Sequence, residues 1–240
     1  IGDGNLVINS PDGTEPADGK LTVGKVQPNG NELKFVSGAE QLEIANIDVF
    51  PYQETTKIIG KDGGGTSCKK LILQGRSIAS VENVELLDNI YIGLLSSLHL
   101  DKAKIKNAKF HIKYNRATAE TIFPISIKED TDGFPEFDGN IQVEREELGN
   151  IIQADEEDLL IAEFEGKSLE SAYQACVNYS KHYNGGEGFN NRDCYNSTDD
   201  SKKSYLRSTR SEDKGKDDDG GLSGGAIAGI VIACVVVAAA

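Results

Sequence analysis

The chain lacks two residue types altogether and is poor in a third class. Its 240 residues include no methionine and no tryptophan, and aromatic residues make up only 7%. A natural reading frame begins with methionine, so we expect the protein to extend upstream of Ile1, where a signal peptide would lie. With so few aromatic residues, we do not expect an aromatic cage that binds a ligand.

Positive charge is the second shortage. Lysine and arginine number 25 against 39 acidic residues, which gives a formal net charge of -14. A nucleic-acid binder needs a basic stripe to displace counterions from phosphates. The one basic cluster, at Lys102, Lys104, Lys106 and Lys109, alternates with other residues as the solvated side of a strand does. We therefore expect no nucleic-acid partner.

Motifs for catalysis and cofactor binding are also missing. The glycine-rich stretch 60–67 lacks the lysine that precedes the serine or threonine of a phosphate-binding loop. In the acidic stretch 129–140, Phe134 and Pro135 stand where a calcium-binding loop needs oxygen ligands. The three histidines, at positions 99, 111 and 182, show no metal-ligand spacing. We expect no catalytic residue, metal or cofactor in this chain. The alternative that a catalytic domain lies upstream of Ile1 is retained.

What the chain has in abundance is alternation of apolar and polar residues. Runs such as KKLILQG (69–75) and KIKNAKFHIKY (104–114) recur from Asn5 to Glu165. Between them lie stretches rich in Gly, Pro, Asn and Asp, the residues that turns require. Period-two alternation predicts strands. We predict a mainly β domain over residues 1–166.

A short internal repeat refines this prediction. The pattern apolar-x-Asn-apolar-x-apolar occurs at 44–49, 81–86, 87–92 and 105–110. Asparagine at a fixed position between strands is typical of the stacked coils of a parallel β-helix. We favour a parallel β-helix-like solenoid, and the alternative is an antiparallel β-sandwich whose strands contain asparagine.

The periodicity changes near Ser168. Apolar residues in SLESAYQACVNYSKHY (168–183) recur three or four positions apart, which predicts a helix with Ser168 as N-cap and Gly185–Gly186 as its stop. We assign residues 167–196 to this helix and a cysteine-bracketed hinge. Residues 197–220 carry interleaved charges and few apolar side chains, so we predict a flexible stalk.

Residues 221–240, LSGGAIAGIVIACVVVAAA after Gly221, carry no charge. About 20 apolar residues suffice to span a bilayer, so we predict a transmembrane segment that is still apolar at Ala240. Gly221, Gly225 and Gly229 are spaced four apart, a pattern that permits close packing of transmembrane helices, or provides flexible joints at the membrane edge. Three aspartates precede the span, and cytoplasmic flanks favour Lys and Arg, so we expect residues 1–219 outside the cell.

Two further features agree with an extracellular location. Asn178 and Asn196 begin N-x-[ST] glycosylation sequons, of which Asn178 is the poorer candidate because it falls within the predicted helix. Cys176 and Cys194 bracket the hinge, and a disulfide between them would join the helix to the stalk base. Cys68 is then either buried or the true partner of one of these two cysteines.

The apolar end also carries a family resemblance. Residues 222–237, LSGGAIAGIVIACVVV after an acidic stalk, resemble the C-terminal membrane segment of trichomonad surface proteins of the BspA-like and polymorphic outer-membrane-protein-like groups. The resemblance covers that segment alone. It implies adhesion or host contact, and it supplies no catalytic residue.

The sequence therefore predicts a single-pass glycoprotein of the plasma membrane. Its expected role is adhesion or recognition of a protein or glycan on another cell, with the membrane as its other partner. The alternative is the C-terminal, non-catalytic part of a membrane-anchored protease or glycosidase whose active site lies upstream.

Overall fold

The fold, taken from a computed structural model, is mainly β. The structure describes residues 4–7, 19–28, 32–36, 39–114, 123–145, 158–186, 189–199 and 201–209. The strands are β1 (Gly4–Val7), β2 (Lys20–Val26), β3 (Glu32–Val36), β4 (Gln41–Val49), β5 (Thr56–Ile59), β6 (Thr66–Leu73), β7 (Ile78–Ile92), β8 (Ser97–Tyr114), β9 (Ile125–Lys128), β10 (Phe137–Arg145), β11 (Asp158–Glu165), β12 (Tyr183–Gly185), β13 (Asn191–Asn196) and β14 (Lys203–Thr209). The helix α1 spans Leu169–Ser180.

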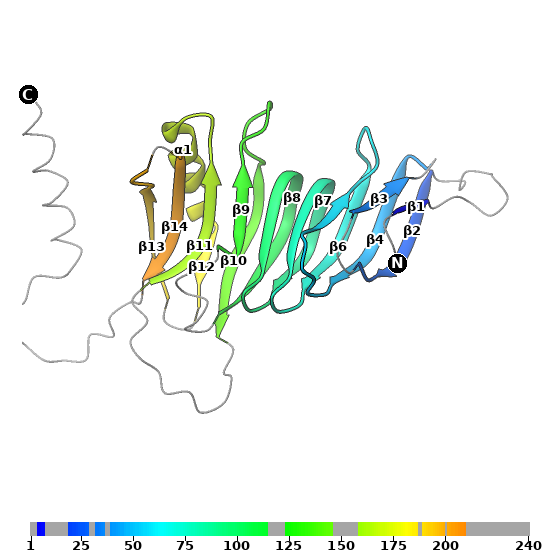
Figure 1. Cartoon of the computed structure of the whole chain (residues 1–240), viewed down its shortest axis with the longest axis horizontal. Coiled ribbons are helices and arrows are strands. Elements are labelled where there is room, and N and C mark those ends of the chain that lie inside the picture. The colour runs from blue at the N-terminus through cyan, green and yellow to red at the C-terminus, as the bar shows by residue number, and fades with distance from the viewer. Residues whose placement is uncertain are drawn as a thin grey trace, which may run out of the picture.

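The strands pair in two parallel rows that share the long strands β7 and β8. One row runs β1-β3-β5-β7-β8-β9-β11, and the other runs β2-β4-β6-β7-β8-β10-β12. Among the strand-to-strand pairings in the described ranges, the two pairings of β14, with β11 and with β13, are antiparallel and the others are parallel. Figure 1 shows the strands side by side along the long axis, with β1 and β2 at one end and α1, β13 and β14 at the other.

The long strands belong to both rows because they bend. Asn83, Asp88 and Asn107 have φ angles of 56°, 52° and 50°, in the left-handed region that Asn and Asp tolerate best among residues with a side chain. The register pairs Leu86 with Ile105, and it therefore brings Asp88 and Asn107 to the same bend on adjacent strands. Two of the four repeated asparagines thus form corners. Asn83 and Asn107 lie at different corners, so the four do not form one stack.

The core consists of apolar side chains that lie above one another on successive strands. Cross-strand pairing and burial define several such rows, and in three long ones every side chain is at most 9% exposed. They are Ile44, Cys68, Leu86, Ile105 and Phe137; Leu71, Ile90, Phe110 and Ile141; and Ile58, Val81, Leu100, Ile127 and Phe164. Full burial of one such aliphatic or aromatic side chain contributes about 2 kcal/mol, so these rows dominate the stability of the fold.

The helix α1 begins where the sequence predicts and ends earlier. The Ser168 side chain accepts a hydrogen bond from the Ser171 N–H, and the Ser171 hydroxyl accepts one from the Ser168 N–H, which confirms the N-cap. The helix ends at Ser180 rather than at the expected Gly185–Gly186. The reason is tertiary: the next residues form β12, which pairs with β10.

The prediction of a flexible stalk over 197–220 is wrong in its first part. Residues 203–209 form β14, which pairs with both β11 and β13. Its inward positions are Ser204, Leu206 and Ser208, all fully buried. Two of these three are small and polar, so the strand lacks the apolar alternation on which the prediction depended. Residues 210–220 and the predicted span 221–240 lie outside the described residues.

Candidate functional site

The predicted disulfide is present. Cys176 in α1 bonds to Cys194 in β13, with 6.0 Å between their Cα atoms. The bond joins the helix to the antiparallel pair β13–β14, so it fastens together the elements at the end of the sheet. Cys68 is a free, buried thiol, which donates to the Lys70 carbonyl at 3.2 Å. Burial raises the pKa of this thiol to about 12.

Both sequon asparagines are exposed. Asn178 lies in the last turn of α1, where its side-chain oxygen accepts a hydrogen bond from Lys181 Nζ at 3.0 Å. Asn196 ends β13, and its oxygen accepts one from the Ser204 hydroxyl at 2.8 Å. Gly221, Gly225 and Gly229 lie outside the described residues, so the structure does not bear on the predicted packing face.

A pocket of about 370 Å³ lies between α1 and the segment that leads into β10; we call it the α1 pocket. Its lining residues are Phe134, Pro135, Glu136, Phe137, Asp138, Ala175, Asn178, Tyr179 and His182. Among the lining residues, the Phe137 ring centroid lies 4.8 Å from that of Tyr179 and 5.1 Å from that of His182. The pocket thus combines an aromatic floor with carboxylates, an amide and an imidazole at its rim.

Hydrogen bonds fix the orientation of two of these rings. The Tyr179 hydroxyl donates to the Pro135 carbonyl at 2.6 Å, and burial raises the pKa of that hydroxyl. His182 Nδ1 lies 3.0 Å from the Gly139 carbonyl. A carbonyl oxygen only accepts, so Nδ1 carries the hydrogen, and in the neutral ring Nε2 is free to accept from a ligand.

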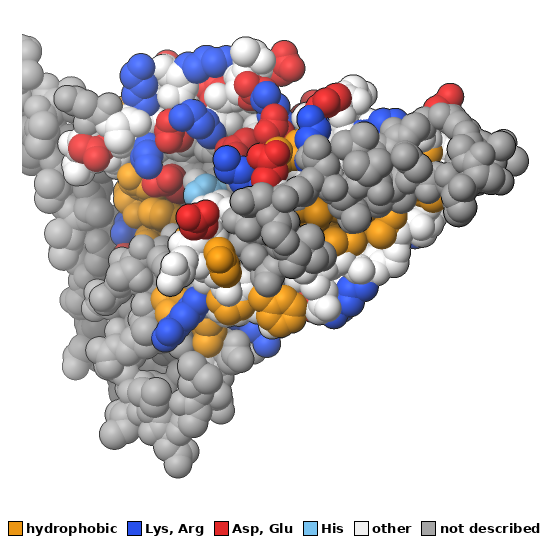
Figure 2. Space-filling model, turned by 45° about the vertical axis from the view of Figure 1, so that its right-hand side comes forward, with side chains coloured by type: hydrophobic (Ala, Val, Ile, Leu, Met, Phe, Trp, Pro, Cys, Tyr) orange, Lys and Arg blue, Asp and Glu red, His pale blue; other side chains and the backbone are white. Residues whose placement is uncertain are grey.

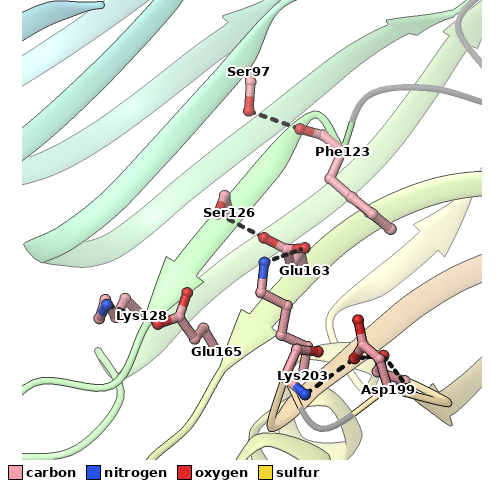
Figure 3. Close-up of polar contacts among 10 residues, drawn as sticks. Ser97, Phe123, Ser126, Lys128, Glu163, Glu165, Asp199 and Lys203 are labelled. Atoms are coloured by element: carbon pink, nitrogen blue, oxygen red, sulfur yellow. Dashed lines mark hydrogen bonds and ion pairs between the residues drawn. The ribbon is translucent and has the colours of Figure 1, made fainter.

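The outer side of β7, β8, β9 and β11 carries a second set of polar groups. The register places Ser80, His99, Ser126 and Glu163 side by side on these four strands. Glu163 accepts hydrogen bonds from Ser126 at 3.5 Å and from Lys203 of β14 at 3.1 Å, as Figure 3 shows. Burial lowers the pKa of His99, and the nearby carboxylates oppose that shift.

This row does not form a nucleophile-base pair. The Ser80 hydroxyl donates to Asp101 at 2.9 Å, and within the described residues no hydrogen bond joins His99 to either serine. Lys128 and Glu165 form a neighbouring ion pair at 2.7 Å. Figure 2 shows acidic and basic side chains interspersed over one side of the molecule, an arrangement typical of a solvated surface.

Tyr91 and His111 belong to a row of side chains that contact one another across four adjacent strands; we call this row the ladder. The rings of Tyr91 and His111 stack at 4.7 Å with an interplanar angle of 12°. Lys70 lies over the Tyr91 ring at 5.2 Å, and His111 Nδ1 lies 2.7 Å from Glu144 Oε1. Because both faces of Tyr91 are already in contact with neighbours, it offers no open ring face to a ligand. The ladder joins β6, β7, β8 and β10.

The glycine-rich stretch 60–67 borders another pocket, of about 430 Å³. Gly63, Gly64 and Gly65 have φ angles of 83°, 89° and 83°, which only glycine adopts readily. Lys61 turns away from any phosphate position and donates to the carbonyls of Ala39 and Glu40. The geometry is therefore that of a structural loop.

The acidic stretch 129–140 forms a tight turn closed by reciprocal backbone hydrogen bonds between Asp130 and Gly133, at 3.1 and 3.2 Å. Among the residues that the structure describes, no group of three or more His, Cys, Asp or Glu side chains is arranged to hold a metal ion. Over the same residues, no helix combines the length and the apolarity needed to cross a membrane.

Comparisons with protein-family models, with curated proteins and with solved structures find no match for this chain. The α1 pocket was not predicted from the sequence. Its two sides lie about 40 positions apart, so no local pattern contains them. The one available signal was the pair of phenylalanines in FPEF (134–137), which are exceptional in a polar stretch.

Proposed function

We propose that this chain belongs to the extracellular part of a single-pass surface protein of the plasma membrane, with a role in adhesion or recognition. The observation that carries the proposal is the Cys176–Cys194 disulfide. Disulfides persist in secreted and surface proteins and are rare where thiols are kept reduced. The exposure of Asn178 and Asn196 is consistent with N-linked glycans at both sequons.

We further propose that the parallel rows form a solenoid of the β-helix type. Support comes from the three rows of core side chains, each of which continues from strand to strand in the same order along the chain. Stacked coils of this kind present long outer faces on which a partner can bind. Alanine substitutions at glycines where adjacent strands approach closely, such as Gly139 and Gly60, test this arrangement.

The membrane anchor rests on the sequence of residues 221–240. Their apolarity and length support a spanning helix, and the resemblance of 222–237 to trichomonad surface proteins supports the same role. An anchor at this end would place the disulfide-bonded end of the domain nearest the membrane. The strands β1 to β8 would then face outward, toward a protein or glycan on another cell.

The test uses the complete protein produced in a eukaryotic host with a secretory pathway. We expect it in the membrane fraction, accessible to protease added outside the cell, and with mobility that increases after glycosidase treatment. Val231→Arg places a charge within the predicted span and costs about 3 kcal/mol of insertion energy, so it should release the protein into the medium. Val231→Leu is the matched control and should stay anchored.

Recognition is measured with the same cells. Cells that display the protein should adhere to target cells more than cells that lack it, and pretreatment of the targets with protease or glycosidase should identify the ligand as protein or glycan. A protein found in the cytosol without glycans, or two Val231 variants that fractionate alike, contradicts the surface assignment. Adhesion equal to that of control cells contradicts the recognition role.

A further inference from the structure

The α1 pocket includes one of the two glycosylation acceptors in its wall. Asn178 is exposed, and its side-chain oxygen is held by Lys181 Nζ at 3.0 Å. The side-chain nitrogen, to which a sugar would be attached, makes no hydrogen bond within the described part of the chain. A sugar on that nitrogen would therefore begin at the rim of a pocket of about 370 Å³.

The pocket wall has the mixed chemistry that a pyranose ring presents. Phe134 and Pro135 are partly exposed and offer apolar surface to the C–H face of a sugar. Glu136 and Asp138 are exposed carboxylates that accept hydrogen bonds from hydroxyl or amide groups. His182 Nε2 adds a further acceptor in the neutral ring, because Nδ1 already donates to Gly139. A polar ligand with one apolar face fits this wall better than a purely apolar one.

We propose that the α1 pocket holds the first N-acetylglucosamine of a glycan attached to Asn178. This inference rests on the proposed extracellular location. The linkage forms when the Asn178 nitrogen displaces the diphosphate from the anomeric carbon of a lipid-linked oligosaccharide supplied by the host. The C–N bond forms, the C–O bond breaks with its electrons leaving on the diphosphate, and the amide loses one proton. The attached sugar then closes the pocket from the α1 side.

Asn196 provides an internal comparison. It is also an exposed sequon residue, and its side-chain oxygen is engaged by the Ser204 hydroxyl at 2.8 Å. It lies at the end of β13 and lines neither of the two pockets described above. A glycan there would lie outside the α1 pocket, so its removal should leave that pocket unchanged.

The experiment uses the complete glycosylated protein from a secretory host, in detergent. Hydrogen exchange is measured over 134–139 and 175–182, together with the thermal midpoint. Asn178→Gln removes the glycan and should speed exchange in 134–139 by about tenfold, whereas Asn196→Gln should not. Ser180→Thr keeps both the sequon and a hydroxyl for the Val177 carbonyl, so it should behave as wild type.

Two treatments isolate the first sugar. An endoglycosidase that leaves one N-acetylglucosamine should preserve the slow exchange. Phe134→Ala should speed exchange in the glycosylated protein and add nothing in the Asn178→Gln background. Should Asn178 carry no glycan while Asn196 does, or should Asn178→Gln leave exchange unchanged, the pocket proposal is overturned and the surface assignment stands. A chain retained in the cytosol without any glycan would remove the premise, and both would then be abandoned.

Discussion

Replacing Gly139 by alanine is expected to destabilise the protein far more than the same change at Gly24. Gly139 lies in β10, next to Ala108 of β8. A Cβ atom at position 139 would lie 2.1 Å from the Ala108 carbonyl oxygen and 3.1 Å from the Ala108 backbone carbon and nitrogen. All three are backbone atoms, so no side-chain rotation relieves the overlap, and the two strands must separate.

The matched control comes from β2. A Cβ atom at Gly24 meets nothing within 4 Å, and neither glycine has a φ angle in the left-handed region. Both substitutions restrict the unfolded chain alike, which by itself stabilises the fold by about 0.5 kcal/mol. The difference between the two variants therefore reports the steric contact. Overpacking of this kind costs about 2 kcal/mol, or about 6 °C in the thermal midpoint of a domain of this size.

The assay is unfolding in urea and by heat, followed by far-ultraviolet circular dichroism. Gly139→Ala should unfold at a lower urea concentration than wild type, and Gly24→Ala should match wild type or exceed it. Gly60 provides a second site, where the Cβ atom would lie 2.0 Å from the Asn83 carbonyl oxygen. If Gly139→Ala and Gly60→Ala both unfolded with the Gly24→Ala midpoint, the close stacking of coils, and the solenoid with it, would be refuted.

Three further results are expected from the cysteines and one carboxylate. Cys194→Ser, or reduction of the bond to Cys176, should lower the free energy of unfolding by about 3 kcal/mol, because their sequence separation of 18 sets the loop entropy; an unchanged urea midpoint contradicts this. Cys68, with its raised pKa, should resist alkylation at about pH 8 until the protein is unfolded, as mass spectrometry would detect. Burial opposes ionisation of Asp48, but hydrogen bonds, including one from Gln74 at 2.7 Å, outweigh it and lower its pKa below 3.8. Its contribution is therefore present above that pH and lost as the pH falls through the lowered pKa. Asp48→Asn should reduce stability at neutral pH and flatten the loss below about pH 4, and an acid-unfolding curve identical to wild type would count against this.

The sequence predicted the class of fold because buried side chains alternate with more exposed ones along much of each strand. In β6, Thr66, Cys68, Leu71 and Leu73 are buried, and Lys69 and Lys70, at an irregularity in the pairing, are exposed. This periodicity is local, so one sequence suffices to detect it. The Ser168 N-cap was predictable for the same reason, since a capping residue acts within one helical turn.

Two features, β14 and the α1 pocket, could not be predicted because they depend on contacts between residues far apart in the sequence. In β14 the buried positions include Ser204 and Ser208, whose hydroxyls bond to Asn196 and to the Asn191 carbonyl of β13. Those partners, not hydrophobicity, allow the serines to be buried. The α1 pocket likewise requires the FPEF segment (134–137) and α1 to meet, and that meeting depends on how β10 and β12 pair.

Two of the repeated asparagines are explained by the backbone conformation at the bends of the strands. We expected these asparagines to occupy one fixed position in successive coils. In the structure Asn83 and Asn107 serve instead as left-handed corners, at different positions in their strands. Asp88 performs the same role opposite Asn107. These positions require a residue that tolerates a left-handed backbone conformation, and both asparagine and aspartate do. Aspartate can therefore replace asparagine at a corner, which makes the repeat harder to recognise in the sequence.

The end of the sheet nearest α1 needs protection that the other strands obtain from their neighbours. A parallel stack leaves the backbone groups of its last strand unpaired, which invites association with another chain. Here β11 is covered by β14, and β14 by β13, whose exposed Arg192 and Asp193 discourage further pairing. The disulfide ties this antiparallel pair to α1. These elements precede the predicted span 221–240 in the chain, so on the proposed topology the covalently fastened end of the sheet would be the end closest to the membrane.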